Sequence, residues 1–201
     1  MNTFNTRLIL ASQSKSRGAL MKNAGLVFEQ IPANVDEDAV KDSLRAQGAS
    51  TRAQAESLAE LKAMKLSSRE SGIVLGADQM LDLEGEPLDK PKGMAGARDH
   101  LQRMRGKTHI LETSLVACEN GQPIWRAHTR PRLTMRNFSD AFIDQYLESA
   151  GEGILSSVGA YHLEGLGAQL FSNIEGDYFS ILGLPLIQLL TWLRDREMIA
   201  S

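Results

Sequence analysis

The apolar run at residues 73–77 (Ile-Val-Leu-Gly-Ala) restricts the fold of this chain more than any other feature. A run this hydrophobic predicts a buried strand. Asp78 closes the run, and Lys90 stands at the end of the expected return arm of the same hairpin. An ionised carboxylate at the end of a buried strand is costly unless a cation, a metal or hydrogen-bond donors compensate it. Asp78 is therefore either a site residue or a strand-end aspartate that caps a turn.

Size and charge exclude several classes of protein. The 201 residues are enough for one large α/β domain or for two small lobes that share a cleft. The net charge of −3 gives no basic surplus for nucleic-acid binding. No apolar stretch is as long as a membrane span, residues 1–7 have no signal-peptide core, and the single Cys118 fits a reducing compartment. We therefore expect a cytoplasmic protein with neither a nucleic-acid nor a membrane partner.

Turn and cap signals divide the chain into strands and helices. The expected strands and extended segments are residues 7–11, 28–35, the hairpin 73–91 that turns at Glu84-Gly85, 108–118 and 124–135. The expected helices are residues 15–23, 50–67, 94–105, a helix capped by Ser139 that carries residues 142–147, and 185–197. We therefore expect residues 1–201 to form a single α/β domain with a mixed, partly antiparallel sheet flanked by helices.

Asn120-Gly121 is a strong turn dipeptide, and it joins the expected strands 108–118 and 124–135. The sequence leaves the oligomeric state open, although this long hairpin offers a surface that could support a homodimer.

The turn after the first strand is a candidate anion pocket. Ser12 and Ser14 come between a strand and a helix, with Arg17 in the first helical turn. Free N–H groups at a helix start, hydroxyl groups and a guanidinium together suit a phosphate. The alternative is an ordinary capped helix with a solvated arginine.

Two further features carry charge where it is unusual. Val35 is followed by three acids at residues 36–38, which suit either a divalent cation or a solvated loop. Lys62 falls on the apolar stripe of the helix at 50–67, so it either snorkels to the surface or meets an anion.

The glycine-rich segment at residues 159–167 predicts tight turns or a close backbone approach to a ligand. Its spacing does not match the dinucleotide-binding pattern that opens a Rossmann helix. The four histidines show no zinc spacing, and we expect each to be structural or exposed.

Eight short motifs, taken in order, resemble the Maf family of nucleoside triphosphate pyrophosphatases, once described as septum-formation inhibitors. They are Ala-Ser-x-Ser-x-x-Arg at 11–17, Val-Asp-Glu at 35–37, Leu-Ala-x-x-Lys-Ala at 58–63, Gly-Ala-Asp at 76–78, Lys-Pro at 90–91, Gly-x-Thr-His at 106–109, Gly-Ala-Tyr at 159–161 and Gly-Leu-Pro-Leu at 183–186. The resemblance covers nearly the whole chain. It implies two lobes around a deep cleft, similar to the inosine triphosphate pyrophosphatases. It also implies hydrolysis of a nucleoside triphosphate to the monophosphate and pyrophosphate with Mg²⁺ or Mn²⁺.

Within this resemblance each candidate residue has an expected role. Asp78 is the expected general base for the attacking water, and Glu37 with Asp78 is the expected metal site. The expected phosphate-neutralising groups are Lys62, Lys90 and Arg17, and the expected phosphate seat is Ser12 and Ser14. Gln79 and Glu164 are the candidates for contacting the base or the ribose. The alternative to an enzyme that clears modified nucleotides is a nucleotide-sensing regulator of cell division with only incidental hydrolysis.

Three departures from the family pattern concern substrate contacts. Lys15-Ser16-Arg17 stands where Pro-Arg-Arg is usual, so one basic phosphate contact is missing or is replaced by Lys15. Asp78-Gln79 is similar to the subgroup that acts on 7-methyl-GTP, whereas many members have Thr after the aspartate. The usual Lys/His-x-Ala before Gly-Ala-Tyr appears as Ser-Ser-Val at residues 156–158, in the region expected to contact the base.

Overall fold

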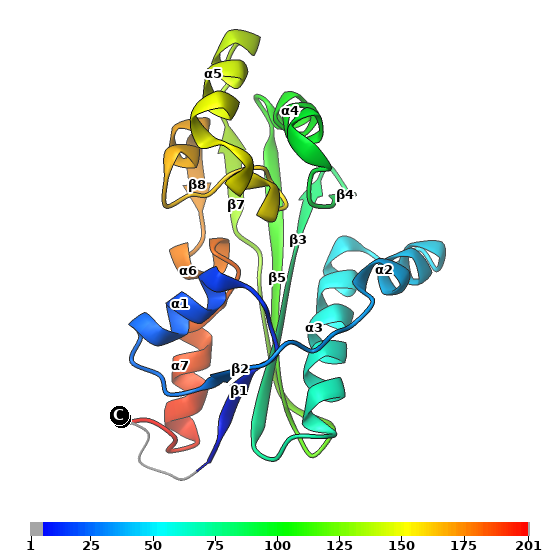
Figure 1. The fold of residues 1–201 in the computed structure, drawn as a ribbon, viewed down its shortest axis with the longest axis vertical. Helices are drawn as coiled ribbons and strands as arrows, with labels where there is room; N and C mark the ends of the chain where they lie inside the picture. The colour runs from blue at the N-terminus through cyan, green and yellow to red at the C-terminus, as the bar shows by residue number, and fades with distance from the viewer. Residues whose placement is uncertain (1–5, 201) are drawn as a thin grey trace.

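The computed structural model describes residues 6–200, in which eight strands form one open mixed sheet (Figure 1). The strand order is β2-β1-β3-β5-β7-β8, with β4 paired to β3 and β6 paired to β5. The strands are β1 (Leu8–Leu10), β2 (Glu29–Gln30), β3 (Ile73–Leu83), β4 (Glu86–Leu88), β5 (Thr108–Glu119), β6 (Gln122–Thr129), β7 (Arg132–Met135) and β8 (Phe171–Glu175).

Seven α-helices and two short 3-10 helices flank the sheet in the described part of the chain. The helices are α1 (Lys15–Asn23), α2 (Glu37–Ala46), α3 (Thr51–Ser67), α4 (Gly93–Met104), α5 (Asp140–Ala150), η1 (Glu152–Ser156), η2 (Leu166–Leu170), α6 (Tyr178–Ile181) and α7 (Leu186–Asp195). Within residues 6–200 none of these helices is both long and apolar enough to span a bilayer. The segment expected to have no signal-peptide core is residues 1–7, and residues 1–5 of it lie outside the described residues.

The antiparallel pair of β3 and β5 forms the long axis of the molecule, because its register runs without a break from Val74 opposite Cys118 to Asp82 opposite Ile110. In Figure 1, α3 covers one side of its lower half and α1 with α7 lies on the other side. The upper half packs against α4 and α5. Burial of these apolar faces supplies most of the driving force for folding. The two halves meet at the middle of β3.

The middle of β3 has a free edge. The parallel strand β1 pairs only with residues 73–75 of β3, and β4 pairs only with residues 81–83. Residues 76–80 therefore have no strand neighbour on that side. Side chains of successive strand residues point to opposite faces, so Asp78 and Gln79 reach this gap from the two faces of the sheet. The gap is where the site described below is built.

Most of the expected elements are confirmed, and the hydroxyl caps explain where three helices begin. The side chains of Ser14, Ser50 and Ser139 accept hydrogen bonds from the third residue after each of them, Arg17, Ala53 and Phe142. Each bond satisfies one of the N–H groups that a helix start leaves unpaired. The mixed, partly antiparallel sheet is also confirmed.

Several expectations about the elements are wrong in detail. Asp78 is not at a strand end, because β3 continues to Leu83 through its pairing with β4 and β5. The extended segment expected at 28–35 forms only the two-residue strand β2. The acidic residues 36–38 do not form a loop, since Asp36 caps α2 by accepting from the Ala39 N–H. The strand expected at 124–135 is interrupted at Pro131, which has no N–H to donate.

Gly76 allows α3 to lie unusually close to β3. A Cβ atom at this position would collide with the Ala59 carbonyl oxygen and with the backbone and side chain of Ala63. These obstacles are backbone and short side chains, which cannot move aside cheaply. The close approach sets the distance between α3 and the strand that carries Asp78.

We expect Gly76→Ala to lower the free energy of unfolding by about 1 to 3 kcal/mol, since the added methyl group overpacks the contact between α3 and β3. Urea denaturation followed by circular dichroism measures the change. Gly153→Ala is the matched control, because a Cβ atom there meets no atom within 4 Å. Equal stability of the two variants would contradict the packing role of Gly76.

Candidate active site

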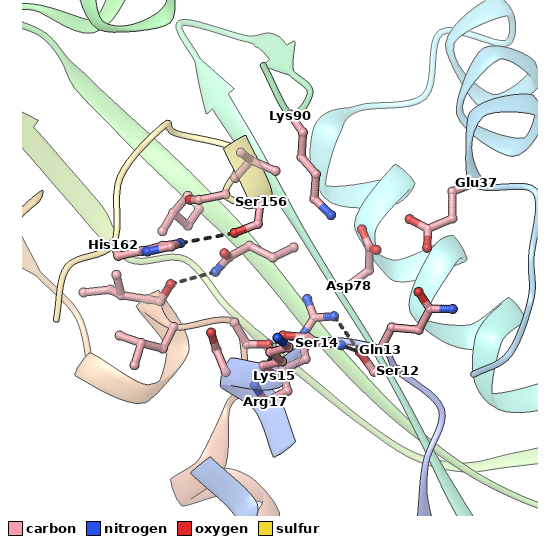
Figure 2. Close-up of a pocket in the computed structure, with 18 of the residues that line it drawn as sticks. Ser12, Gln13, Ser14, Lys15, Arg17, Glu37, Asp78, Lys90, Ser156 and His162 are labelled. Carbon is pink, nitrogen blue, oxygen red and sulfur yellow. Dashed lines mark hydrogen bonds between the residues drawn. The ribbon is translucent and has the colours of Figure 1, made fainter. Parts of the chain in front are cut away.

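A cleft of about 900 Å³ opens at the free edge of β3, and all nine side chains predicted as site residues line it. They are Ser12, Ser14, Arg17, Glu37, Lys62, Asp78, Gln79, Lys90 and Glu164. They come from the β1–α1 turn, α1, α2, α3, β3, the segment after β4 and the turn after η1. Figure 2 shows part of this lining, with Glu37, Asp78 and Lys90 among the labelled side chains. The volume lies within the range of known small-molecule sites. Their roles remain predictions, whereas their common location is a feature of the structure.

Lys62 joins the two carboxylates at the floor of the cleft. Its Nζ lies 2.7 Å from Asp78 Oδ1 and 2.8 Å from Glu37 Oε1. The side chains of Lys62 and Asp78 are only 9% and 8% exposed, whereas that of Glu37 is 45% exposed. Lys62 therefore meets anions and does not snorkel to the surface. A buried ammonium and carboxylate that hydrogen-bond each other compensate the cost of removing both charges from water.

The two carboxylates differ in their affinity for protons. Burial raises the pKa of Asp78, and the positive charges of Lys62 and Arg17 only partly offset this effect. Burial also acts on Glu37, but Lys62, Lys41 and Lys90 together hold its pKa below the ordinary value. Two carboxylates joined to the same lysine thus have pKa values pushed in opposite directions. This separation is typical of sites where one acid handles protons and the other stays ionised.

Arg17 forms hydrogen bonds with three segments of the chain at the cleft. Its Nε donates to the Gly183 carbonyl at 2.8 Å, and its Nη1 donates to the Ala77 carbonyl at 3.0 Å and to Ser12 Oγ at 3.3 Å. Within residues 6–200 its Nη2 has no hydrogen-bond partner. Burial lowers the pKa of Arg17, and the nearby charges of Asp78 and Glu37 act against that effect. The guanidinium is therefore held rigidly, with donor capacity left for a ligand.

The serine side chains of the β1–α1 turn accept hydrogen bonds from backbone N–H groups of the same turn and of α1. Ser12 Oγ accepts from the Ser14 N–H at 3.2 Å, and Ser14 Oγ accepts from the Arg17 N–H at 3.3 Å. The N–H groups of Lys15 and Ser16 make no hydrogen bond to the rest of the described chain. The turn thus presents two free amides, two hydroxyl groups and the positive end of α1 to the cleft.

The side chain of Gln79 is hydrogen-bonded on the face of β3 opposite to the face that carries Asp78. Its amide nitrogen donates to Thr113 Oγ1 at 2.8 Å, to the Ser180 carbonyl at 2.9 Å and to the Ile181 carbonyl at 3.2 Å. Carbonyl oxygens only accept, so these partners fix which end of the amide is the nitrogen. The donors of Gln79 are used within the protein, and only its oxygen remains for a ligand.

The wall opposite α2 is formed by residues 152–164. Figure 2 shows Ser156 and His162 on one side of Asp78 and Glu37 on the other. His162 Nε2 lies 3.3 Å from Ser156 Oγ, and the exposed Glu164 follows in the same turn. Neither Ser156 nor His162 was predicted as a site residue. For Ser156 the departure from the family pattern just before Gly-Ala-Tyr was the available signal, whereas His162 follows that motif and had no such signal.

Lys41 is a further charged cleft residue that was not predicted from the sequence. It follows Glu37 by one helical turn in α2, so both side chains are on the same side of that helix. The i, i+4 spacing of an acid and a lysine was the available signal, but no helix was expected there.

The carboxylates fit a divalent metal that a substrate completes. Within residues 6–200 no three His, Cys, Asp or Glu side chains are grouped so that they could hold a metal ion by themselves. Asp78 and Glu37 nevertheless both face the cleft and contact the same Lys62 nitrogen. Mg²⁺ is usually bound by one or two carboxylates together with substrate phosphates. These two side chains therefore suit a hard divalent ion when a triphosphate supplies the remaining oxygens.

Comparison with known families agrees with the motifs and the geometry. Residues 7–196 match the family model described as "Maf-like protein". The chain belongs to this family. A protein of Hyphomonas neptunium named "Nucleoside triphosphate pyrophosphatase" is 53% identical over 192 residues, which cover 96% of this chain and 97% of the relative. The resemblance inferred from the eight motifs is thereby confirmed.

Two further relatives cover a similar share of the chain. "Nucleoside triphosphate pyrophosphatase 1" of Jannaschia sp. is 50% identical over 97% of this chain and 99% of its own length. A protein of Caulobacter vibrioides with the name "Nucleoside triphosphate pyrophosphatase" is 50% identical over 94% of this chain and 95% of its own length. The 7-methyl-GTP subgroup suggested by Asp78-Gln79 stays a prediction.

We expect Lys62→Met to lower the free energy of unfolding by about 3 to 5 kcal/mol at neutral pH, because it leaves Asp78 as an uncompensated buried charge. The deficit relative to wild type should grow as the pH rises from acidic to neutral, through the folded pKa of Asp78 in the variant. The folded pKa of Asp78 is already raised, so its favourable contribution is present at low pH and is lost as the pH rises through that pKa. Removing Lys62 raises this pKa further.

Urea denaturation across this pH range measures the deficit of the Lys62 variant. Arg52→Met is the control, since it breaks the exposed Arg52–Glu56 pair on the same helix and should change stability little. Adding Asp78→Asn to Lys62→Met should recover much of the loss. A deficit that does not depend on pH would contradict the coupling of the two groups.

Proposed function

We propose that the protein hydrolyses a nucleoside triphosphate to the monophosphate and pyrophosphate. The observation that carries the proposal is the Lys62-bridged pair of Asp78 and Glu37 at the floor of a cleft of about 900 Å³. Free amides of the β1–α1 turn, together with Lys90, which has no ion-pair partner in the described part of the chain, provide donors and positive charge for phosphates. The names of the relatives support the same reaction. The family match over residues 7–196 supports one functional unit.

In the proposed reaction a water oxygen attacks the α-phosphorus. The bond from the α-phosphorus to the α–β bridging oxygen breaks, and pyrophosphate leaves. The water proton goes to Asp78, whose burial makes it a stronger base than an ordinary carboxylate. Lys62 keeps Asp78 ionised and orients it, while Arg17 and Lys90 stabilise the negative charge that develops on the phosphate oxygens.

We propose that Glu37 and Asp78 hold a divalent cation when the triphosphate is bound. Such an ion supplies charge stabilisation on the phosphate oxygens. The low pKa of Glu37 keeps this carboxylate ionised for the role. Gln79 presents its carbonyl oxygen and Glu164 its carboxylate, so we propose that both accept hydrogen bonds from the base or the ribose. Clearance of modified nucleotides, including 7-methyl-GTP, is the proposed physiological task, and it rests on the resemblance at Asp78-Gln79.

We expect Asp78→Asn to reduce pyrophosphate release by about 10²- to 10⁴-fold, because the amide keeps the shape of the side chain and loses its basicity. A coupled pyrophosphate assay over ATP, GTP, CTP, UTP, dTTP and 7-methyl-GTP with Mg²⁺ measures the effect. Asp38→Asn is the control, since this exposed acid lies beside Glu37 in sequence but does not line the cleft.

Two results would count against this assignment. Turnover by the Asp78 variant within about threefold of wild type would remove Asp78 from the base role. Wild-type protein that binds one of these nucleotides but releases no pyrophosphate would instead be a nucleotide sensor.

We expect Glu37→Gln to weaken Mn²⁺ binding by about tenfold or more, since the amide is neutral and the second metal carboxylate is lost. Electron paramagnetic resonance titration of Mn²⁺ with a non-hydrolysable triphosphate analogue measures the affinity without turnover. Glu152→Gln is the matched control, because it removes a cleft carboxylate on the opposite wall to which no contact with the nucleotide or the metal is assigned. Equal Mn²⁺ affinity of wild type and the Glu37 variant would place the metal elsewhere.

A further inference from the structure

Asp89 holds two cations of α2 at the mouth of the cleft. Its Oδ1 lies 2.9 Å from Lys41 Nζ, and its Oδ2 lies 2.9 Å from Arg45 Nη1. Burial raises the pKa of Asp89, but the hydrogen bonds from Arg45 and Lys41 outweigh this effect and lower it. Asp89 is therefore ionised, and it fixes Lys41 across the gap between α2 and the segment after β4.

The cluster offers free donors rather than a surplus of positive charge. Asp89 pairs with Lys41 and Arg45, and the acids Glu37, Asp38 and Asp42 of the same region also act on these cations. Lys90 has no ion-pair partner within residues 6–200. Lys41 lines the cleft with a side chain that is only 17% exposed. A lysine ammonium has three donors, and Asp89 accepts one of them. Lys41 therefore has a positive charge and free donors available for an additional anion in the cleft.

The position of this cluster identifies which part of a triphosphate it faces. Figure 2 shows the wall with Ser156 and His162 on one side of Asp78 and Glu37 on the other. Lys41 lies one turn beyond Glu37 on the same side of α2. A nucleotide with its base at the 152–164 wall and its α-phosphorus beside Asp78 has its terminal phosphates directed toward α2.

We propose that Lys41, positioned by Asp89, binds the β- and γ-phosphates and hence the departing pyrophosphate. This inference rests on the proposed function and adds to it the subsite for the leaving group. Lys41 acts on the group that departs, whereas the Lys62–Asp78 pair acts on the phosphorus that is attacked. The competing explanation is that Lys41 only pins α2 to the segment after β4.

Product inhibition separates these two explanations. We expect Lys41→Met, which removes the charge and keeps the length, to raise the inhibition constant of pyrophosphate by about tenfold or more, as loss of a charged hydrogen bond does. The inhibition constant of the nucleoside monophosphate should change by less than about twofold, because that product does not reach α2. Lys22→Met is the control, an exposed lysine in the last turn of α1 outside the cleft.

Asp89 is a positioning residue in this scheme, and a double-mutant cycle tests that role. We expect Asp89→Asn to weaken pyrophosphate binding on its own, and to weaken it no further when Lys41→Met is already present. Isothermal titration calorimetry with inorganic pyrophosphate measures all four proteins, and thermal midpoints show whether each variant is folded.

The possible results distinguish this inference from the proposed function. Unchanged pyrophosphate binding in the Lys41 variant, with normal wild-type turnover, overturns the Lys41 subsite alone. Equal weakening of pyrophosphate and monophosphate binding also overturns it, since that pattern indicates displacement of α2 as a whole. Wild-type protein without triphosphate turnover overturns the proposed function, even if Lys41 is required for binding pyrophosphate.

Discussion

Lys62 Nζ lies between the carboxylates of Asp78 and Glu37, and this contact joins α3, β3 and the start of α2. Asp78 and Lys62 are both buried, so each depends on the other for compensation of its charge. The pair can form because Gly76, two residues before Asp78 on the same face of β3, lets α3 approach the strand backbone. The absence of one side-chain atom at Gly76 therefore sets the geometry of the charged groups.

The free edge of β3 turns this pair into a site. If β1 or β4 extended along residues 76–80, a neighbouring strand would cover the edge beside Asp78. In the gap Asp78 is open to a ligand on one side and is held by α3 on the other. The cleft already contains both basic side chains and carboxylates. A bound triphosphate would pair with the basic side chains, and a divalent cation would pair with the carboxylates. Binding would thus leave no additional charge unpaired.

Local chemistry made much of the fold predictable. Serine caps marked the starts of α1, α3 and α5, and the apolar stripe of α3 placed Lys62 on its inward face. The sequence order of the motifs also indicated the set of residues that gather in the cleft. The caps and the stripe are short-range signals, since each depends on side chains within a few turns of the backbone, whereas the order of the motifs spans residues 11–186.

The features that were missed depend on contacts between distant segments. Helix α2 has no buried residue, and its short apolar side, Val40 and Leu44, was not recognised as a helical pattern, so Lys41 was missed with it. Asp78 was expected at a strand end because the apolar run stops at Ala77, whereas β3 continues to Leu83 through its pairing with the distant segments β4 and β5. The role of Gly76 follows only from the distance between α3 and the sheet.

The most direct test is a crystal structure with Mg²⁺ and a nucleoside triphosphate analogue whose α–β bridging oxygen is replaced by methylene. The α-phosphorus should lie beside the Asp78 carboxylate, with the base at the 152–164 wall and the terminal phosphates toward α2. A triphosphate bound outside the cleft, or bound with the base toward α2, would contradict the account.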